Sequence, residues 1–600
     1  MTEAEEVGPG TRVIVIGAGP AGLTAARELA RRGLRPVVLE QSAIVGGLSR
    51  TESYRGYHFD MGGHRFFTKL DEVRKIWQDV LGPEFLRRPR MSRIYYNGRF
   101  FNYPLKPFNA LAGLGVGRAL LVVLSYLRWQ VFPYRHEDTF EQWVTNRFGR
   151  RLFLTFFKTY TEKVWGIPCS ELRAEWAAQR IKDLSLRSAI VSMFVKPGTS
   201  IKTLIEEFDY PRLGPGMMWR AVAQEVREGA GAVRLDSEVT AIRRRDMRVE
   251  GVVVTTAGRI EEIGGDHFVS SMPVTELVRR LTPPAPAAIL EAARRLTYRD
   301  FLTVCLIVNR PDPFPDNWIY VHSPEVQVGR IQNFRSWSPD MVPEPGRSSL
   351  GLEYFCREGD ALWTMSDAEL IRLGKRELER IGLAREAEIA DGCVFRVPKA
   401  YPVYDAGYRD ALDQVRGYVD GLENLQTIGR NGLHRYDNQD HAMLTGLLAV
   451  RNLMDRERHD LWSVNTEGEY HEELAEAEEV EAVAGAVEGR LAEIFPKVDG
   501  VALGIATGTV TGLLLALATL ILVLKGGPVV GPNLGLLAQF LPGYTVTGAG
   551  SLLGLFYGLT VGFLVGWGFA LLRNAVLFLS LAVLRRRAQL RLLKRFLEFV

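Results

Sequence analysis

Residues 12–22 read RVIVIGAGPAG, and residues 23–33 read LTAARELARRG. The β-branched run before Gly17 is typical of a buried parallel strand, and the amphipathic stretch after Gly22 predicts a helix. Gly17 permits a tight turn, Gly19 lets the backbone approach a pyrophosphate, and Gly22 lets the helix pack closely on the strand. The helix N-terminus would stabilise the negative charge of the phosphates. The predicted phosphate contacts are Gly17, Gly19, Pro20, Ala21 and Gly22.

A second strand and a second glycine turn extend this pattern. The strand PVVLE ends at Glu40, where a carboxylate can accept hydrogen bonds from both hydroxyls of an adenosine ribose. The next segment, QSAIVGGLSR at 41–50, would bring backbone N–H groups to the same pyrophosphate. No second GxGxxG unit follows a strand, since GLGVG at 113–117 precedes an apolar helix. We therefore expect no separate NAD(P)H domain. An external electron donor, either NAD(P)H or a reductase, would have to reach the cofactor directly.

The order of strand, glycine turn, helix, strand and glutamate resembles the FAD-binding start of the amine oxidase, protoporphyrinogen oxidase and UDP-galactopyranose mutase superfamily. The resemblance implies FAD as the cofactor. It also implies that the backbone of Val239, in VRLDSEVTAI at 233–242, reaches the adenine. The strand and turn LQTIGR at 425–430 would direct another helix N-terminus at the flavin. The further implied cofactor contacts are Glu40, Gln41, Gly46, Gly47, Leu48, Gly63, His64, Gly429, Arg430 and Asp440.

Several segments resemble UDP-galactopyranose mutase in particular, in the same order along the chain. GGHRFFT at 62–68 is similar to the histidine loop of that family, and YTEKVWG at 160–166 is similar to its YTxKxWG segment. The pairs YR at 298–299, YP at 401–402 and RY at 435–436 match further motifs. Phe67 and Asn438 depart from the pattern, because mutases usually carry a histidine and an aspartate there. The implied catalytic residues are His64, Arg65, Tyr160, Trp165, Arg299, Tyr401 and Tyr436.

The roles of these residues follow from the same resemblance. Arg299 and Tyr436 would meet the substrate diphosphate, Arg430 would contact the flavin, and the remaining aromatic residues would line the cleft. Taken singly, a buried tyrosine or tryptophan suits an ordinary core, and a lone arginine suits a surface ion pair. The shared order of the motifs is what favours a substrate site.

Three function classes remain open at this point. The first is a mutase-like enzyme that acts through flavin N5 on a nucleotide- or lipid-linked sugar, by covalent catalysis. The second is an FAD-dependent oxidoreductase resembling amine oxidases, protoporphyrinogen oxidase or polyprenyl and carotenoid desaturases, with a membrane-derived substrate. Residues 100–129 would suit a membrane-dipping flap for such a lipid, or an ordinary buried helix. The third class is a flavin-bound membrane scaffold.

The composition describes a folded protein. Of the 600 residues, 47% are hydrophobic and 24% are charged, and 74 basic against 70 acidic residues leave a net charge of +4. This balance does not indicate a nucleic-acid partner. The acidic, polar N-terminus is not expected to act as a secretory signal. The cysteines Cys169, Cys305, Cys356 and Cys393 lie far apart, which favours free thiols in a reducing compartment and predicts no metal site.

The C-terminal region is strongly apolar. Lys525 is the only charged residue from 500 to 572, and residues 501–524 and 551–572 are each long enough to cross a bilayer. A hydrophobic hairpin buried in a soluble core is the alternative. Glycines recur every four residues in both stretches, so that each helix would carry a small-residue stripe for close packing. Basic residues clustered at 585–595 are typical of the cytoplasmic side, and less so of nucleic-acid binding.

These observations predict an α/β protein with a Rossmann-type FAD-binding domain, an inserted α+β substrate domain and a C-terminal two-helix transmembrane hairpin. The FAD-binding domain comprises 1–90, 210–272 and 392–460, and the substrate domain comprises 91–209 and 273–391. An acidic helical linker at 461–498 leads to the hairpin and basic tail at 499–600. We expect a two-pass membrane protein with its catalytic body and C-terminal tail in the cytoplasm. The expected partners are the sugar substrate, membrane lipid and the electron donor. The glycine stripes would pair either within one chain or between two copies of it, as a homo-oligomer.

Overall fold

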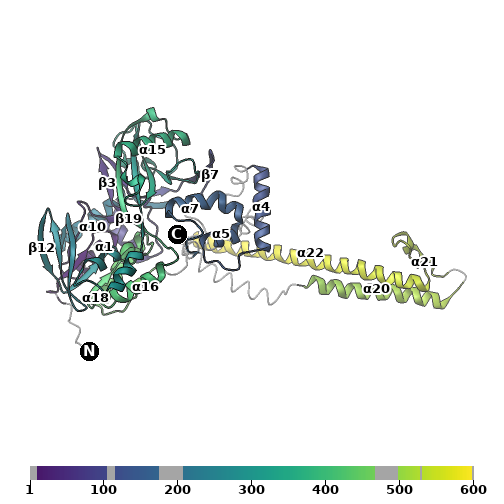
Figure 1. The fold of residues 1–600 in the computed structure, drawn as a ribbon. Coiled ribbons are helices and arrows are strands. Elements are labelled where there is room, and N and C mark those ends of the chain that lie inside the picture. The colour runs from purple at the N-terminus through teal and green to yellow at the C-terminus, as the bar shows by residue number, and fades with distance from the viewer. Residues whose placement is uncertain are drawn as a thin grey trace. The chain divides into compact units, whose positions relative to one another are not determined.

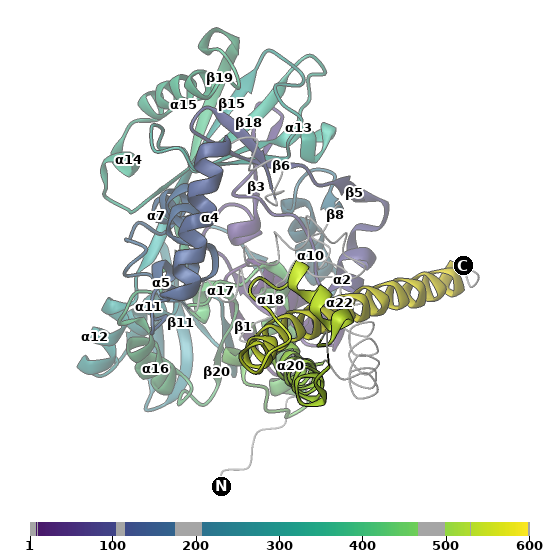
Figure 2. The same ribbon diagram turned by 90° about the vertical axis from the view of Figure 1, so that its right-hand side faces the viewer.

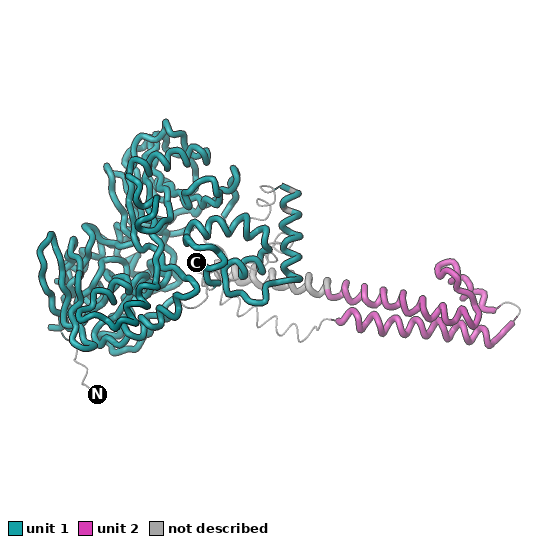
Figure 3. The backbone as a smooth tube through the Cα atoms, viewed as in Figure 1, with its two compact units in different colours: residues 1–194, 203–474 teal, residues 195–202, 475–600 magenta. Residues whose placement is uncertain are grey.

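The computed structural model describes residue 8 and residues 10–103, 115–174, 207–465, 498–527 and 530–597. Beyond residue 574, only the course of the backbone is described. The chain divides into two compact units (Figure 3): residues 1–194 with 203–474, and residues 195–202 with 475–600. Most of the predicted acidic linker lies outside the described residues.

A parallel sheet forms the centre of the cofactor-binding part of the first unit. Its strand order is β20-β13-β1-β2-β9, and all neighbours are parallel. The strands are β1 (Val13–Ile16), β2 (Val37–Leu39), β9 (Ala232–Arg234), β13 (His267–Ser270) and β20 (Leu425–Thr427). Every residue of β1 is buried, because a parallel sheet covered on both faces requires apolar side chains on both sides of the strand.

Helices and a second sheet surround this parallel sheet (Figures 1 and 2). Helix α1 (Pro20–Arg31) packs against α10 (Gly216–Glu228) and α18 (Gln439–Met454), and α2 (Asp71–Leu81) packs beside the latter two. The second sheet has the order β12-β11-β10-β14. Its strands are β10 (Ser237–Arg245), β11 (Arg248–Thr256), β12 (Arg259–Gly264) and β14 (Leu281–Thr282); the adjoining helices are α11 (Val274–Arg280), α12 (Ala287–Arg295) and α16 (Tyr408–Val419). Together these elements bring the first and last segments of the cofactor domain side by side.

The substrate part is built on a mixed sheet of order β19-β15-β18-β17-β16-β6-β7. Its strands are β6 (Ser92–Tyr96), β7 (Arg99–Asn102), β15 (Tyr298–Val308), β16 (Trp318–Val321), β17 (Arg330–Asn333), β18 (Ser348–Cys356) and β19 (Ile389–Pro402). The helices α13 (Phe334–Trp337), α14 (Ala361–Thr364) and α15 (Asp367–Ile381) accompany it. Strand β19 pairs with β15 as far as Pro402, so this sheet includes residues 392–402, which the sequence analysis assigned to the cofactor domain.

A group of short helices adjoins this sheet. It consists of α4 (Val116–Val131), α5 (Phe140–Phe148), α6 (Arg150–Leu152), a π-helical turn at Phe153–Phe157 and α7 (Lys158–Trp165). Two strand pairs complete the unit: β3 (Thr51–Tyr54) with β4 (Tyr57–Asp60), and β5 (Phe85–Pro89) with β8 (Glu207–Pro211). Helix α7, which directly follows the π-helical turn, carries the YTEKVWG segment up to Trp165.

The second unit is a helical hairpin of α20 (Gly500–Lys525) and α22 (Gly548–Leu597), with the short α21 (Pro532–Gly535) between them (Figure 3). The glycine stripes of the two helices face each other. A Cβ added at Gly508 would lie 2.6 Å from the Leu559 carbonyl oxygen, and one added at Gly562 would lie 2.8 Å from the Gly508 Cα. The backbones therefore approach too closely for any larger residue, as small-residue packing between helices requires.

Threonines reinforce this contact by hydrogen bonds between the helices. Thr507 Oγ1 donates to the Gly562 carbonyl at 2.8 Å, and Thr511 Oγ1 donates to the Gly558 carbonyl at 2.7 Å. Both helices are long and apolar enough to cross a bilayer, with a mean hydropathy of 2.2 for Gly500–Lys525 and 1.8 for Gly548–Asn574. Only 17% and 22% of their most apolar windows are buried, whereas a hairpin in a soluble core would be mostly buried. The stripes pair within one chain.

Candidate functional site

The predicted phosphate turn follows β1 and leads into α1. Gly17 has a φ of +99°, which a residue with a side chain rarely adopts. A Cβ at Gly22 would lie 2.0 Å from the Gly17 carbonyl oxygen, so only glycine lets the helix start against the turn. The backbone at Gly19 caps α1 without a side-chain hydrogen bond. The free N–H groups at the start of this helix are therefore available to an anion.

The second glycine turn lies directly against the first. A Cβ at Gly47 would lie 3.1 Å from the Gly19 Cα, and Gly47 itself has a φ of +53°. The Gly46 N–H donates to the Ala18 carbonyl at 2.8 Å and holds the two turns together. Two backbone segments without side chains thus form a cradle that side chains would otherwise fill. This arrangement fits the pyrophosphate of FAD.

Glu40 connects these turns at the end of β2. Its Oε2 accepts a hydrogen bond from the Ala18 N–H at 2.7 Å, and its Oε1 accepts one from the Ser42 N–H at 2.9 Å. The side chain is buried, with 7% of the residue exposed. Each carboxylate oxygen can accept a second hydrogen bond. Glu40 would hold the ribose hydroxyls with this remaining capacity.

The other predicted cofactor residues lie on several elements. Gly429, with a φ of +73°, turns from β20 against α1, and its N–H donates to Thr445 Oγ1 at 2.9 Å on α18. Asp440 is buried in the first turn of α18. The carbonyl of Val239 accepts from the Arg280 guanidinium. Contacts of Gln41, Leu48, Gly63, Val239 and Asp440 with the flavin or adenine stay predictions.

His64 is held in one tautomer by its loop. Its Nε2 lies 2.7 Å from the Met61 carbonyl oxygen, which can only accept, so Nε2 carries the proton and donates. Burial lowers the pKa of His64 to about 4, and the charges of Arg430 and Arg330 act in the same direction. The imidazole is therefore neutral at pH 7. Arg65, the next residue, lies over the Trp318 ring at 5.9 Å.

Three of the predicted aromatic residues form one cluster. The rings of Tyr401 and Tyr436 stack in parallel with centroids 5.5 Å apart and an interplanar angle of 10°. The Trp165 ring lies 6.2 Å from each of them. Burial raises the pKa of Tyr401 to about 12, so that its hydroxyl stays protonated. The sequence motifs at 160–166, 401–402 and 435–436 therefore meet in space.

Arg430 lies against this cluster. The guanidinium carbon lies 4.7 Å from the Tyr436 centroid and 5.6 Å from the Tyr401 centroid. Its Nε and Nη2 donate to the Asp437 carbonyl at 2.8 and 2.6 Å, and its Nη1 donates to the Ala400 carbonyl at 3.1 Å. Arg430 thereby ties the segment after β20 to the end of β19. Its contact with the flavin stays a prediction.

Arg299 makes similar contacts at the end of α7. Its guanidinium donates to the carbonyls of Phe355 at 2.8 Å, Val164 at 3.2 Å and Lys163 at 3.3 Å. A Cβ at Gly166 would lie 2.6 Å from its Cζ, so the glycine of the YTEKVWG segment makes room for this side chain. Arg299 stabilises the negative end of the helix dipole and places Trp165. Its contact with a substrate phosphate stays a prediction.

An ion pair that the sequence analysis missed lies beside this cluster. Arg330 and Glu353 face each other on β17 and β18 and bond at 2.8 Å (Nε to Oε1) and 2.5 Å (Nη2 to Oε2). Their side chains are 16% and 0% exposed. Gln332 Nε2 donates to Glu353 Oε1 at 2.7 Å. The charge of Arg330 opposes the rise in the pKa of Tyr160 and Tyr401, which places it among the predicted site residues.

Tyr160 and its neighbour Lys163 use the other side of α7. The Tyr160 ring stacks on His322 with centroids 4.7 Å apart. Lys163 Nζ donates to the carbonyls of Ser323 at 2.7 Å, Val328 at 3.2 Å and Val321 at 3.3 Å. Burial lowers the pKa of Lys163 to about 8. The lysine of the motif thus anchors α7 to the end of β16 and to the connection that leads into β17, the strand of Arg330, which the sequence analysis did not foresee.

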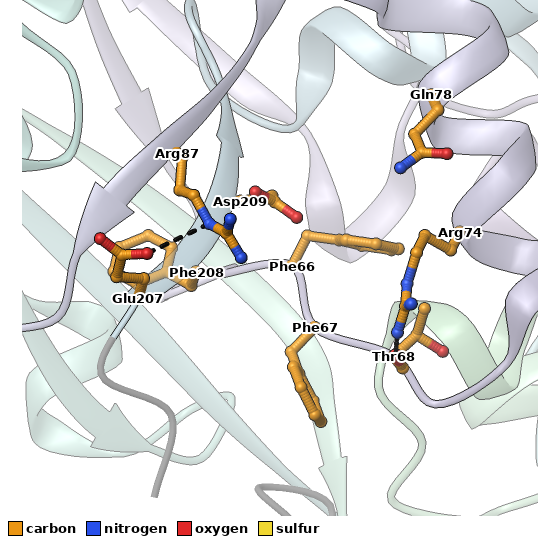
Figure 4. A pocket seen from close by; sticks show the side chains of 9 residues that line it. All are labelled: Phe66, Phe67, Thr68, Arg74, Gln78, Arg87, Glu207, Phe208 and Asp209. Atoms are coloured by element: carbon orange, nitrogen blue, oxygen red, sulfur yellow. Dashed lines mark hydrogen bonds and ion pairs between the residues drawn. The ribbon is translucent and has the colours of Figure 1, made fainter. Parts of the chain in front are cut away.

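A cavity of about 380 Å³ adjoins the histidine loop (Figure 4). The loop residues Phe66, Phe67 and Thr68 form part of its lining. Arg87 pairs with Glu207 at 3.2 Å on one side, and Arg74 Nη2 donates to the Thr68 carbonyl at 2.7 Å on the other. Phe67, one of the departures from the mutase pattern, therefore lines a cavity. Among the described residues, no group of three or more His, Cys, Asp or Glu side chains could hold a metal ion.

Comparisons with known proteins agree with this site. The model of the family described as flavin containing amine oxidoreductase matches residues 20–450. The L-amino-acid oxidase of Crotalus adamanteus is 26% identical over 311 residues, which cover 48% of this chain and 56% of that protein. A 4,4'-diapophytoene desaturase (4,4'-diapolycopene-forming) of Methylomonas sp is 34% identical over 93 residues, covering 14% of this chain and 18% of that protein. The chain thus spans about half the length of the first oxidase relative.

A solved structure of reduced UDP-galactopyranose mutase has the same fold. It superposes with a TM-score of 0.66 at 20% identity, covering 76% of this chain and 98% of the mutase. At this identity the likeness concerns the fold. The family match and the glycine cradle confirm the predicted FAD cofactor, the α/β fold and the assignment to the flavoenzymes. They do not distinguish between the reactions considered above.

Proposed function

Because the chain belongs to the family of flavin-containing amine oxidoreductases, we propose that it is an FAD-dependent enzyme acting on a nucleotide- or lipid-linked sugar at a membrane. Bound FAD supplies a hydride acceptor when oxidised and a nucleophilic ring nitrogen when reduced. The residues of the chain bind and orient the sugar and exclude water. The cofactor would be held by the cradle of Gly17, Gly19, Gly46 and Gly47 and by Glu40.

The stacked pair of Tyr401 and Tyr436 carries this proposal. Sugar rings have an apolar face of C–H groups that packs against aromatic rings, while their hydroxyls need polar partners. Trp165 packs beside the pair and is only 1% exposed, so it supports the rings from within the fold, and the phenol groups of the pair supply hydrogen bonds. The predicted histidine, arginine and tyrosine residues near this pair would orient the sugar hydroxyls and the linked phosphate.

His64 and Arg330 complete the arrangement with two fixed polar groups. The neutral His64 is fixed in its loop by the Met61 carbonyl, which lies 2.7 Å from its Nε2. Arg330 keeps its charge beside Glu353, so the pair is neutral as a whole and tolerates burial. We expect His64 to face the cofactor and Arg330 to position Tyr160 and Tyr401.

A second candidate is a net oxidation of an apolar, membrane-derived substrate. It is favoured by the guanidinium groups of Arg299 and Arg430, whose donors largely bond backbone carbonyls. Such a substrate needs no diphosphate clamp. The family description, amine oxidoreductase, also suits it.

We further propose that α20 and α22 anchor the enzyme in the membrane as two passes, with the body and the basic tail in the cytoplasm. The length, hydropathy and exposure of both helices support the anchor. An electron donor, either NAD(P)H or a reductase, would keep the flavin reduced. Delivery of a sugar to a membrane glycan pathway fits this location.

An anaerobic assay distinguishes the two candidates. The purified enzyme is tested oxidised and after chemical reduction, with UDP-galactose and with a lipid extract of the host. If the proposal holds, chromatography shows a change in the ring form of the sugar only with the reduced enzyme. The redox state of the flavin then shows no net change. If a component of the extract instead bleaches the oxidised flavin, and no ring form changes, the oxidoreductase candidate replaces the first.

A further inference from the structure

We propose that the outward face of α4 lies on the surface of an anionic lipid bilayer, as a contact separate from the C-terminal hairpin. This inference rests on the proposed membrane attachment. The relevant residues are in unit 1 and are described with their side chains. Within that unit, α4 packs against α5 and α6 (Figure 1).

The apolar stripe of α4 faces outward. Leu120, Leu124, Leu127 and Val131 are spaced as one helix face and are 58%, 53%, 52% and 68% exposed; Phe132, just after the helix, is 68% exposed. A helix of a soluble domain normally turns such a stripe toward the core. A contiguous exposed stripe of this kind marks a contact surface.

The inward face of α4 is fixed, so the stripe cannot turn inward. Val122 and Tyr126 are buried, with 8% and 7% exposed. A Cβ at Gly149 would lie 2.8 Å from both the backbone N and the Cα of Tyr126, so α4 lies backbone to backbone against the start of α6. Ser125 Oγ also accepts a hydrogen bond from the Arg151 N–H at 3.2 Å. Rotating the leucines into the unit would break these contacts.

The charge around the stripe indicates lipid as the occupant. Residues 115–136 contain Arg118, Arg128 and Arg135, all exposed, and no aspartate or glutamate. Of the two acidic residues that follow, Glu137 pairs with Arg147 at 2.7 Å and Asp138 is exposed. Trp129 and Tyr134 stack at 4.7 Å beside the C-terminal end of the helix. Leucines flanked by arginines and by amphipathic aromatic rings are typical of helices that lie in the headgroup region of anionic membranes.

The same charges argue against a second copy of the chain. A symmetric pair of α4 helices would bring the arginines of both copies to one interface, with no acidic residue in 115–136 to compensate. An anionic lipid surface supplies the compensating charge without any defined groove. Because α20 and α22 would hold the chain at such a surface, α4 needs only a weak affinity of its own.

Bromolipid quenching in the full-length holoenzyme tests this contact. The enzyme is placed in nanodiscs of phosphatidylcholine and phosphatidylglycerol, with a fluorescent label on Leu124→Cys. Ile260→Cys, on β12 and 73% exposed, is the matched control outside the stripe. Leu514→Cys, on α20 and 62% exposed, reports on the anchor. The unsubstituted chain gives the background from its native cysteines, and flavin absorbance verifies folding.

We expect brominated lipid to quench the label at Leu124 several-fold more than the label at Ile260. Equal, weak quenching at Leu124 and Ile260 would overturn the contact. Shielding of Leu124 from aqueous iodide without lipid quenching would also overturn it, since protein would then cover the stripe. Quenching at Leu514 is read separately: without it the proposed anchor fails, whatever Leu124 shows.

A charge variant tests the choice of lipid. The Leu124→Cys chain with Arg118→Gln, Arg128→Gln and Arg135→Gln should lose the difference in quenching between phosphatidylglycerol discs and pure phosphatidylcholine discs. Quenching at Leu514 should remain unchanged. An undiminished preference for phosphatidylglycerol at Leu124 would contradict the role of the arginines.

Discussion

Tyr401 and Tyr436 stack face to face with ring centroids 5.5 Å apart, although they come from β19 and from the segment after β20. The Arg430 guanidinium lies within 6 Å of both ring centroids, at 4.7 and 5.6 Å, and donates to the backbone carbonyls of Asp437 and Ala400. This contact joins the substrate sheet to the last part of the cofactor domain. A substrate that reaches Tyr436, the partly exposed member of the pair, would therefore meet the place where the two parts join.

The aromatic pair should control substrate binding more than stability. An aromatic contact contributes about 0.5–1.5 kcal/mol beyond area burial, so losing a comparable contact between the Tyr436 ring and the sugar in Tyr436→Leu should raise KM roughly two- to tenfold. Tyr436→Phe keeps the ring and should lose only what the hydroxyl contributes. Steady-state kinetics on both variants check this. An equal effect of the two substitutions would assign the role to the hydroxyl and not to the stacked ring.

Two helical glycines, Gly22 at the cradle and Gly417 outside it, should respond differently to substitution by alanine. Gly22→Ala would place a Cβ 2.0 Å from the Gly17 carbonyl oxygen and should abolish flavin retention. Gly417→Ala on α16 meets nothing within 4 Å and should raise the free energy of unfolding by about 0.5–1 kcal/mol, because alanine favours helix. Flavin absorbance per protein and thermal unfolding measure both. Full flavin content in Gly22→Ala would contradict the proposed cradle.

Removing one partner of the buried pair of Arg330 and Glu353 should destabilise the protein more than removing both charges. Glu353→Gln leaves a buried guanidinium without its counter-charge, and we expect a loss of about 3–5 kcal/mol in the free energy of unfolding. The double variant Arg330→Met with Glu353→Gln removes the charge and should recover part of this loss. Denaturant unfolding of the two single variants and the double variant gives the coupling directly. Additive losses would mean that the two side chains act independently.

Lowering the pH should reduce the free energy of unfolding, in part because His64 is neutral in the folded protein. Its folded pKa of about 4 lies below the ordinary value of 6.5, so the unfolded chain binds more protons between these values. Stability from this residue is therefore fully present above about pH 6.5 and falls as the pH drops toward 4. The difference in unfolding free energy between wild type and His64→Gln isolates this effect from other groups. A difference that does not change with pH would place His64 in a solvated site.

The hairpin should fold within one chain. Cysteines at Leu515 and Gly554, where an added Cβ at 554 would lie 3.2 Å from Leu515 Cγ, should cross-link intramolecularly in membranes. Gly508→Ile should suppress this cross-link by separating the backbones, whereas Gly568→Ala, with nothing within 4 Å, should leave it intact. Cross-linked dimers on denaturing gels would instead indicate that the stripes join two copies.

Much of the cofactor site could be predicted because its determinants are local. The glycine spacing in 17–22 and the glutamate at the end of the next strand specify a strand, turn and helix without knowledge of distant residues. The aromatic cluster was predicted only through the order of family motifs, since Trp165, Tyr401 and Tyr436 are far apart in the chain.

The remaining features depend on register and on donor geometry. Arg330 meets Glu353 only because β17 and β18 pair in that register. From the sequence alone, two charged residues on separate strands would suggest a surface ion pair and not a buried one. The available signal was a single glutamate, Glu353, within the otherwise uncharged strand SSLGLEYFC at 348–356. The arginines Arg299 and Arg430 were predicted at the site, but not that backbone carbonyls would take most of their donors.

The most direct test of a sugar-binding aromatic wall is saturation-transfer NMR on the reduced holoenzyme with UDP-galactose and with lipid-linked sugars from the host. We predict transfer to the ring protons of the sugar, and loss of that transfer in Tyr436→Leu while the nucleotide or lipid signals persist. Sugar signals that receive no saturation, or that are unchanged in Tyr436→Leu, would contradict the proposal.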